Sequence, residues 1–108
     1  MHRDDIIERL QANADIIRDH GVTALYLYGS AARDQAGPQS DIDLFADVDY
    51  GRFGFVAFMD LRDYLAKLFD RKVDFTTRAA LHPDISNRIV DSAIKVLDHG
   101  TLNPVAAE

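Results

Sequence analysis

The sequence contains no cysteine, so the chain can form neither a disulfide nor a thiolate metal site. Any metal that it binds must therefore have oxygen or nitrogen ligands. No apolar run approaches the roughly 20 residues that a membrane-spanning helix needs. The N-terminal residues 1–5 are mostly charged and have no signal-peptide apolar core. We therefore expect a cytoplasmic protein that has no contact with a membrane.

Positive charge is also in short supply. The 108 residues carry 12 Lys and Arg against 18 Asp and Glu, which gives a formal net charge of −6. No block of basic residues is present, and a protein needs such a patch to neutralise nucleic-acid phosphates. The composition argues against direct nucleic-acid binding and is compatible with a basic protein partner. At this length we expect one domain over residues 1–100, followed by a C-terminal tail over 101–108.

The apolar residues follow two periods along the chain. Helical spacing predicts three helices, over about residues 4–19, 53–69 and 83–99. β-Branched and aromatic runs predict three strands, over residues 22–28, 41–48 and 72–77. A single helical turn and a loop are expected between the first two strands, over 31–33 and 34–40. The order α-β-β-α-β-α indicates a small α+β or α/β sandwich, with three to four helices packed on a short mixed sheet of about three strands.

Two carboxylates interrupt the second predicted strand, in Ser-Asp-Ile-Asp-Leu. Asp41 and Asp43 are two residues apart, so their side chains point to the same side of a strand. Aspartate is depleted in strands, and like charges on one face repel each other. The pair is therefore unfavourable unless a cation lies between the oxygens, and hard oxygen ligands suit Mg²⁺ or Mn²⁺. The alternative is a pair of surface carboxylates on an edge strand.

A Gly-Ser turn precedes this pair, with ten residues between Ser30 and Asp41. Such a turn can present backbone N–H groups to a phosphate. Ser30 would donate its hydroxyl and N–H to the β- or γ-phosphate of a nucleotide. Arg33 can pair with the leaving pyrophosphate, because a guanidinium fork matches phosphate oxygens. The plainer alternatives are a turn that only ends a strand at Gly29, and a solvated arginine at a helix end.

A third carboxylate, Asp74, lies on the next predicted strand in Lys-Val-Asp-Phe-Thr-Thr. If that strand is adjacent to the second one, Asp74 can complete a two-metal site or accept the proton of an attacking hydroxyl. Otherwise it is an ordinary surface aspartate. Ser40 either caps the turn before the second strand or belongs to the site. The remaining candidates are interpreted as structural: the four histidines, which lack metal-site spacing, and the aromatic core residues Phe55, Phe58 and Phe69.

The set formed by Gly29-Ser30, ten intervening residues and Asp41-x-Asp43 resembles the signature of the DNA polymerase beta nucleotidyltransferase superfamily. The fuller form, Gly-Ser-Ala-Ala-Arg followed by Ser-Asp-Ile-Asp-Leu, is similar to the minimal nucleotidyltransferases (MNT) of prokaryotes. This resemblance continues through the third carboxylate, at Asp74. It implies an α+β nucleotidyltransferase fold, in which Asp41 and Asp43 bind two Mg²⁺ ions and Asp74 binds the catalytic one. Gly29 and Ser30 would hold the triphosphate of ATP.

The same resemblance implies a partner. Minimal members are commonly paired with a separately encoded, helical HEPN-domain toxin, which they neutralise as antitoxins. Such an antitoxin can transfer AMP from ATP to a tyrosine of the toxin, and a hetero-oligomer of the two chains is expected. The chain has no extra domain for recognising an acceptor, which favours an acceptor brought by another chain. Two other hypotheses stay open: a binding module that covers the partner's active site without catalysis, and a nucleotide-sensing regulator.

Overall fold

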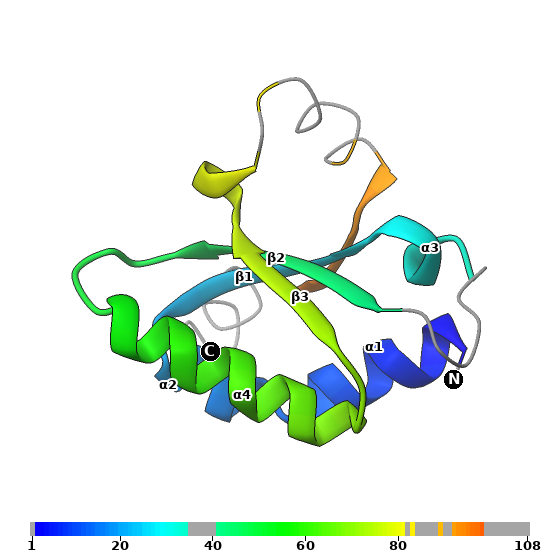
Figure 1. Cartoon of the computed structure of the whole chain (residues 1–108), viewed down its shortest axis with the longest axis horizontal. Helices are drawn as coiled ribbons and strands as arrows, with labels where there is room; N and C mark the ends of the chain where they lie inside the picture. Colours follow the sequence, from blue (N-terminus) through cyan, green and yellow to red (C-terminus); the bar gives the residue numbers. More distant parts are fainter. Residues whose placement is uncertain (1, 35–40, 82, 84–88, 90–91, 99–108) are drawn as a thin grey trace, which may run out of the picture.

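The structure is a computed structural model that describes residues 2–34, 41–81, 83, 89 and 92–98 (Figure 1). The described helices are α1 (Arg3–Ala12), α2 (Ala14–Asp19), α3 (Gly29–Ala32), α4 (Phe55–Phe69) and the 3-10 turn η1 (Arg78–Ala80). The strands are β1 (Val22–Tyr28), β2 (Ile42–Val48), β3 (Val73–Thr77) and β4 (Ile94–Leu97). In this part of the chain, no helix has both the length and the apolar character needed to cross a membrane.

The four strands form one mixed sheet in the order β3-β2-β1-β4. Strand β1 is antiparallel to both of its neighbours, whereas β2 and β3 are parallel. Parallel neighbours need a crossover connection, and α4 supplies it between β2 and β3. The prediction of an α+β fold with helices on a short mixed sheet is therefore confirmed, with four strands instead of about three.

The helices α1, α2 and α4 cover one face of the sheet (Figure 1). That face carries the apolar members of each strand, which alternate with the residues of the opposite face. The largest fully buried side chains on the helices and strands of this layer are Ile6, Leu10, Ile17, Leu25, Leu27, Ile42, Leu44, Leu61 and Leu65. We call the sheet face turned away from these three helices the outer face.

The predicted helix over 4–19 is two helices, because the chain breaks at Asn13. The Asn13 side chain donates a hydrogen bond to the Arg9 carbonyl (2.8 Å) and accepts one from the Tyr64 hydroxyl. Local side-chain bonds of this kind compete with the helical hydrogen-bond ladder. Because of this break the two helices pack on different strands: α1 contacts β4, and α2 contacts β1.

The predicted helix over 83–99 is wrong at its end. Pro83, Ile89 and Ser92 have helical backbone, but Ile94–Leu97 form strand β4 against β1. Val96 and Leu97 are buried as predicted, within a sheet instead of a helix stripe. Alternating β-branched residues fit a half-buried sheet surface, and pairing with the edge of β1 outweighs the helical pattern. Of the loop predicted over 34–40, only Asp34 is described, and the predicted tail over 101–108 falls outside the described residues.

One predicted core aromatic is not in the core. Phe69 is buried and Phe58 packs on Phe75, with ring centroids 5.7 Å apart. Phe55 is 76% exposed. It stands in the first turn of α4, at the border of the apolar stripe, so helical spacing alone overstated its burial.

We expect the packing of α4 to be essential to the fold. Leu65→Ala removes a fully buried side chain in the second half of the helix and should lower the free energy of unfolding by about 2–5 kcal/mol. Lys67→Ala, at an exposed position of the same helix, is the matched control. Urea denaturation measures both, and equal midpoints for the two variants would contradict this packing.

Candidate functional site

The turn at the end of β1 requires a glycine at position 29. Gly29 has φ +73°, a conformation that favours glycine, and α3 begins there directly. A Cβ at this position would overlap the Asp43 carboxylate. Buried Ala31 and Ala32 anchor the single turn of α3 in the core. The structure therefore places the predicted Gly-Ser turn directly against the second carboxylate of the Asp-x-Asp pair, and the helical turn predicted at 31–33 already starts at Gly29.

Asp43 and Asp74 occupy the same register of neighbouring parallel strands. Asp43 is the partner of Asp74 in β3 and of Tyr28 in β1, so the three residues form one row across the outer face. Adjacent strands lie roughly 4.8 Å apart, which brings the two carboxylates close together. Asp43 is half-buried and Asp74 is exposed. The convergence of these two carboxylates beside the glycine turn is the centre of the candidate site.

The carboxylates of this row repel one another, and this repulsion changes the pKa values of the groups in it. Burial raises the pKa of Asp43, and the charges of Asp74 and then Asp41 raise it further. Burial also raises the pKa of Tyr28 to about 12, with Asp43 and Asp74 as the next causes. Both shifts disfavour additional negative charge at this point. A divalent cation would relieve the strain, and carboxylate oxygens are the ligands that Mg²⁺ prefers.

Asp41 stands slightly apart from the other two carboxylates. It precedes β2, and its Oδ2 atom lies 3.7 Å from the Lys72 Nζ atom. Among the described residues, no three His, Cys, Asp or Glu side chains are gathered closely enough to hold a metal ion by themselves. A site of this kind fits Mg²⁺ only with further ligands from substrate phosphates and water, which is its usual mode of binding.

The other predicted site residues lie in α3, directly after it, or outside the described residues. Arg33 is exposed and ends α3, where its backbone N–H donates to the Gly29 carbonyl (3.4 Å). Ser30 follows Gly29 within α3 and is partly exposed. Ser40 falls outside the described residues. His20 binds the Ile16 carbonyl through Nδ1 (2.8 Å) at the end of α2, as a helix-capping residue does.

A second cluster on the outer face fastens β3 to β2. Arg78 donates to Asp47 twice, from Nε to Oδ1 (2.6 Å) and from Nη2 to Oδ2 (3.1 Å). Its guanidinium also lies over the rings of Tyr26 and Phe45, 4.9 and 5.2 Å from their centroids. These two rings stack on each other at 4.7 Å. Because Arg78 follows β3 directly, the cluster helps to keep Asp74 in register with its neighbour.

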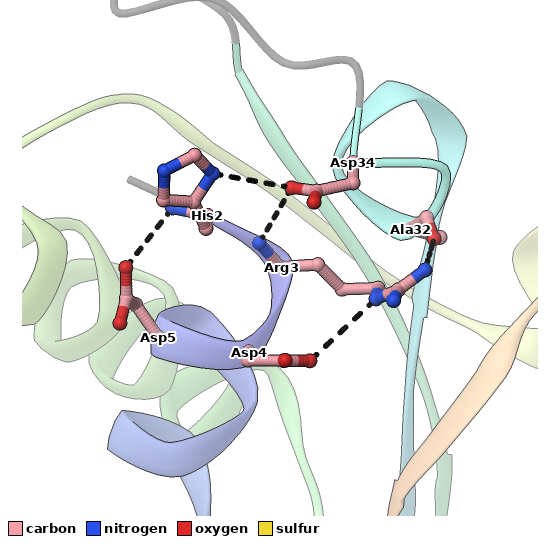
Figure 2. Close-up of polar contacts among 6 residues, drawn as sticks. All are labelled: His2, Arg3, Asp4, Asp5, Ala32 and Asp34. Atoms are coloured by element: carbon pink, nitrogen blue, oxygen red, sulfur yellow. Dashed lines mark hydrogen bonds and ion pairs between the residues drawn. The ribbon is translucent and has the colours of Figure 1, made fainter.

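The sequence did not predict a group of polar contacts between the start of α1 and the end of α3 (Figure 2). We call this group, formed by His2, Arg3, Ala32 and Asp34, the clasp. The Arg3 backbone N–H donates to Asp34 Oδ1 (2.9 Å), and Arg3 Nη1 donates to the Ala32 carbonyl (3.4 Å). The Arg3 N–H is the largest cause that lowers the pKa of Asp34, and His2 adds to it from 3.7 Å. Asp34 has φ +58°, which aspartate tolerates better than most residues. No sequence motif marks this contact, because its partners are 31 residues apart.

Comparison with known proteins gives one family for nearly the whole chain. The sequence model described as "Nucleotidyltransferase domain" matches residues 6–96. Two Methanocaldococcus jannaschii proteins, each assigned the name protein adenylyltransferase, are 32% identical over 95 residues and 30% identical over 82 residues. The matches cover 85% and 76% of this chain, and 95% and 87% of the two relatives.

Solved structures share the fold. A structure assigned as a minimal nucleotidyltransferase has a TM-score of 0.76 at 26% identity, over 87% of this chain and 95% of that one. A toxin–antitoxin structure with AMP-PNP has a TM-score of 0.64 at 21% identity, over 91% and 74% of the two chains. A complex of tri-AMPylated Shewanella oneidensis HEPN toxin with an MNT antitoxin gives 0.57 at 17% identity, over 90% and 76%. The last two likenesses show the fold alone.

The glycine turn yields a test of the local geometry. Gly29→Ala forces an L side chain into positive φ and into the Asp43 carboxylate, so it should lower the free energy of unfolding by more than about 1 kcal/mol. Gly54→Ala is the matched control, because a Cβ there meets nothing within 4 Å and φ is −106°. Thermal unfolding of the two variants measures the difference. A Gly29→Ala protein as stable as Gly54→Ala would show that the turn is not built as described.

The raised pKa of Asp43 yields a pH-dependent prediction. Folding raises the pKa of the Asp43 carboxyl group. Such a group destabilises the folded state when the pH is above the pKa that it has in the unfolded chain, which is about 4. In a metal-free buffer, Asp43→Asn should therefore be more stable than the wild type at pH 7. This advantage should fade as the pH falls below about 4, where both states are protonated. Asp60→Asn, at an exposed position of α4, controls for the change in net charge. Urea denaturation at several pH values gives the comparison, and an advantage that persists at pH 3 would contradict the assignment.

Proposed function

The chain belongs to the nucleotidyltransferase domain family, and on that premise we propose that it transfers AMP from ATP to a hydroxyl of a partner protein. The observation that carries this proposal is the row in which Asp43 and Asp74 face each other beside the Gly29 turn. Two carboxylates next to a phosphate-binding turn are the equipment of metal-assisted nucleotidyl transfer. The relatives assigned as protein adenylyltransferases support AMP as the group transferred and a protein as the acceptor.

Asp43 and Asp74, joined by Asp41 at the start of β2, would hold two Mg²⁺ ions, with Mn²⁺ as the alternative. The crowded charge of the row supports this assignment, because burial and neighbouring carboxylates raise the pKa of Asp43. When bound, the metal neutralises charge on the phosphates and on the leaving pyrophosphate. Lys72, which pairs with Asp41, offsets part of the negative charge of these carboxylates within the protein itself.

The other residues act on the nucleotide and the acceptor. The backbone N–H groups of the turn and the Ser30 hydroxyl bind the triphosphate, and Arg33 pairs with the pyrophosphate; we add Ser40 to this phosphate-binding group. Asp74, the more exposed carboxylate, accepts the proton of the attacking hydroxyl. A bond forms between that oxygen and the α-phosphorus, and the bond from the α-phosphorus to the bridging oxygen breaks. Pyrophosphate leaves with the electron pair, and the proton passes from Asp74 to water.

We assign the partner as a HEPN toxin and the acceptor as one of its tyrosine hydroxyls, so that the chain acts as an antitoxin within a hetero-oligomer. Support comes from structural neighbours of the same fold, which include an MNT antitoxin bound to a tri-AMPylated HEPN toxin. The described residues form one four-stranded sheet with its helices, which favours an acceptor that another chain brings. A cytoplasmic setting, where ATP is abundant, suits this role.

The test is a transfer assay with the full chain, α-labelled ATP, Mg²⁺ and a HEPN-domain protein as the candidate acceptor. We expect label on the partner, and a loss of more than about a hundredfold in rate for Asp43→Asn, since even residues behind the metal ligands typically cost 10–100-fold. Asp60→Asn should retain the wild-type rate. Mass spectrometry of the labelled partner identifies the acceptor side chain.

The binding-module hypothesis gives a different result in the same assay. If the wild-type chain neutralises the toxin while no label is transferred, neutralisation is by occlusion and the enzymatic proposal fails. If Asp43→Asn still forms the complex but no longer neutralises the toxin, neutralisation is by catalysis.

A further inference from the structure

A groove runs along the free side of β3, next to Asp74. It has a volume of about 390 Å³ and is lined by Arg62, Asp63 and Ala66 of α4 and by the four consecutive residues 72–75. Successive residues of a strand face opposite sides of the sheet. Four consecutive lining residues therefore mean that the groove follows the backbone edge of the strand. We call it the β3 edge groove.

The backbone along this groove offers unused pairing groups. Among the described strands, β3 pairs only with β2 and is an outermost strand of the sheet (Figure 1). The Ile42 N–H donates to the Lys72 carbonyl (3.1 Å), so the backbone groups of Lys72 point into the sheet. The backbone N–H and C=O groups of successive strand residues point to opposite edges of the strand. The backbone groups of Val73 and Phe75 therefore point outward, into the groove. An exposed strand edge of this kind is a template for an additional strand.

The order of the strands fixes the side from which an acceptor must enter. The phosphate-binding turn ends β1, Asp43 lies on β2 and Asp74 lies on β3, at the edge. Attacking and leaving oxygens lie roughly in line on opposite sides of the phosphorus. With pyrophosphate at the turn on the β1 side, the hydroxyl approaches from the β3 side. In this arrangement Tyr28, which belongs to the same row, would lie on the leaving-group side.

We propose that the acceptor segment of the partner protein binds in the β3 edge groove as an extended strand that continues the sheet, with its acceptor side chain on the outer face beside Asp74. This inference rests on the proposed function, because it states how the acceptor of that same site is held. The residues flanking the acceptor then point to the opposite face, toward α4. There Ala66 leaves space, and the Arg62 guanidinium, which lies 5.8 Å from the Phe58 ring centroid, offers a positive charge.

The first test fills the groove. Ala66→Trp places a bulky side chain in it, whereas Lys67→Trp puts the same side chain on the exposed surface one position along. We expect Ala66→Trp to slow AMP transfer to the partner by at least tenfold, with the affinity for AMP-PNP in Mg²⁺ unchanged, and Lys67→Trp to behave as the wild type. Transfer at the wild-type rate by Ala66→Trp would overturn the groove and leave the proposed function standing. If the wild-type chain transfers no AMP, the proposed function fails and this inference falls with it.

A surface variant covers the case in which Ala66→Trp does not fold. Arg62→Glu reverses the charge at the groove without filling it, and Arg62→Lys retains the charge. We expect Arg62→Glu to raise the KM for the partner about tenfold with little change in kcat, and Arg62→Lys to restore most of the loss. An unchanged KM for Arg62→Glu would contradict the proposal that the acceptor segment binds beside Arg62 in this groove.

Amide hydrogen exchange tests the strand pairing directly. In the free protein, the outward N–H groups of Val73 and Phe75 should exchange faster than that of Asp74, which points into the sheet. In the complex with the partner and AMP-PNP, exchange at Val73 and Phe75 should slow by at least tenfold. Complex formation that leaves both amides unprotected would overturn strand addition, whatever the outcome of the transfer assay.

Discussion

The repulsion between Asp43 and Asp74 is the constraint on which the rest of this structure depends. Two like charges about 5 Å apart near a protein surface repel by about 3 kcal/mol before screening by solvent. The strands that carry them are held together by apolar residues on the other face: Ile42, Leu44, Val73 and Phe75 are all buried against the helices. Burying four such side chains contributes about 6–12 kcal/mol, which outweighs the repulsion. The fold can therefore keep two acidic groups side by side on its outer face.

Much of this arrangement was accessible from the sequence, because it rests on local patterns. The bounds of β1 were predicted, and β2 and β3 each begin one residue after the predicted start. Asp43 alternates with buried apolar residues, so its face followed from the two-residue period. Its proximity to Asp74 was a conditional prediction, because it required the third strand to be adjacent to the second, as it is in the structure.

The errors arose where distant residues decide the local structure. The segment Ile94–Leu97 suits a helix stripe or a strand, and pairing with β1, some seventy residues earlier in the chain, selects the strand. The break at Asn13 depends on Tyr64, which is 51 residues away. The ion pair between Lys72 and Asp41 joins two elements in the same way. Such contacts leave no periodic trace in the sequence.

The clasp between Arg3 and Asp34 has a practical consequence for anyone who handles this protein. It links the first helical residue to the segment that follows α3, through a single backbone hydrogen bond and an arginine side chain. A fusion partner attached ahead of His2 would begin beside that segment, and its linker must leave the Arg3 amide free to reach Asp34. An affinity handle at this end therefore lies next to the end of α3, and a cleavable linker is the safer choice.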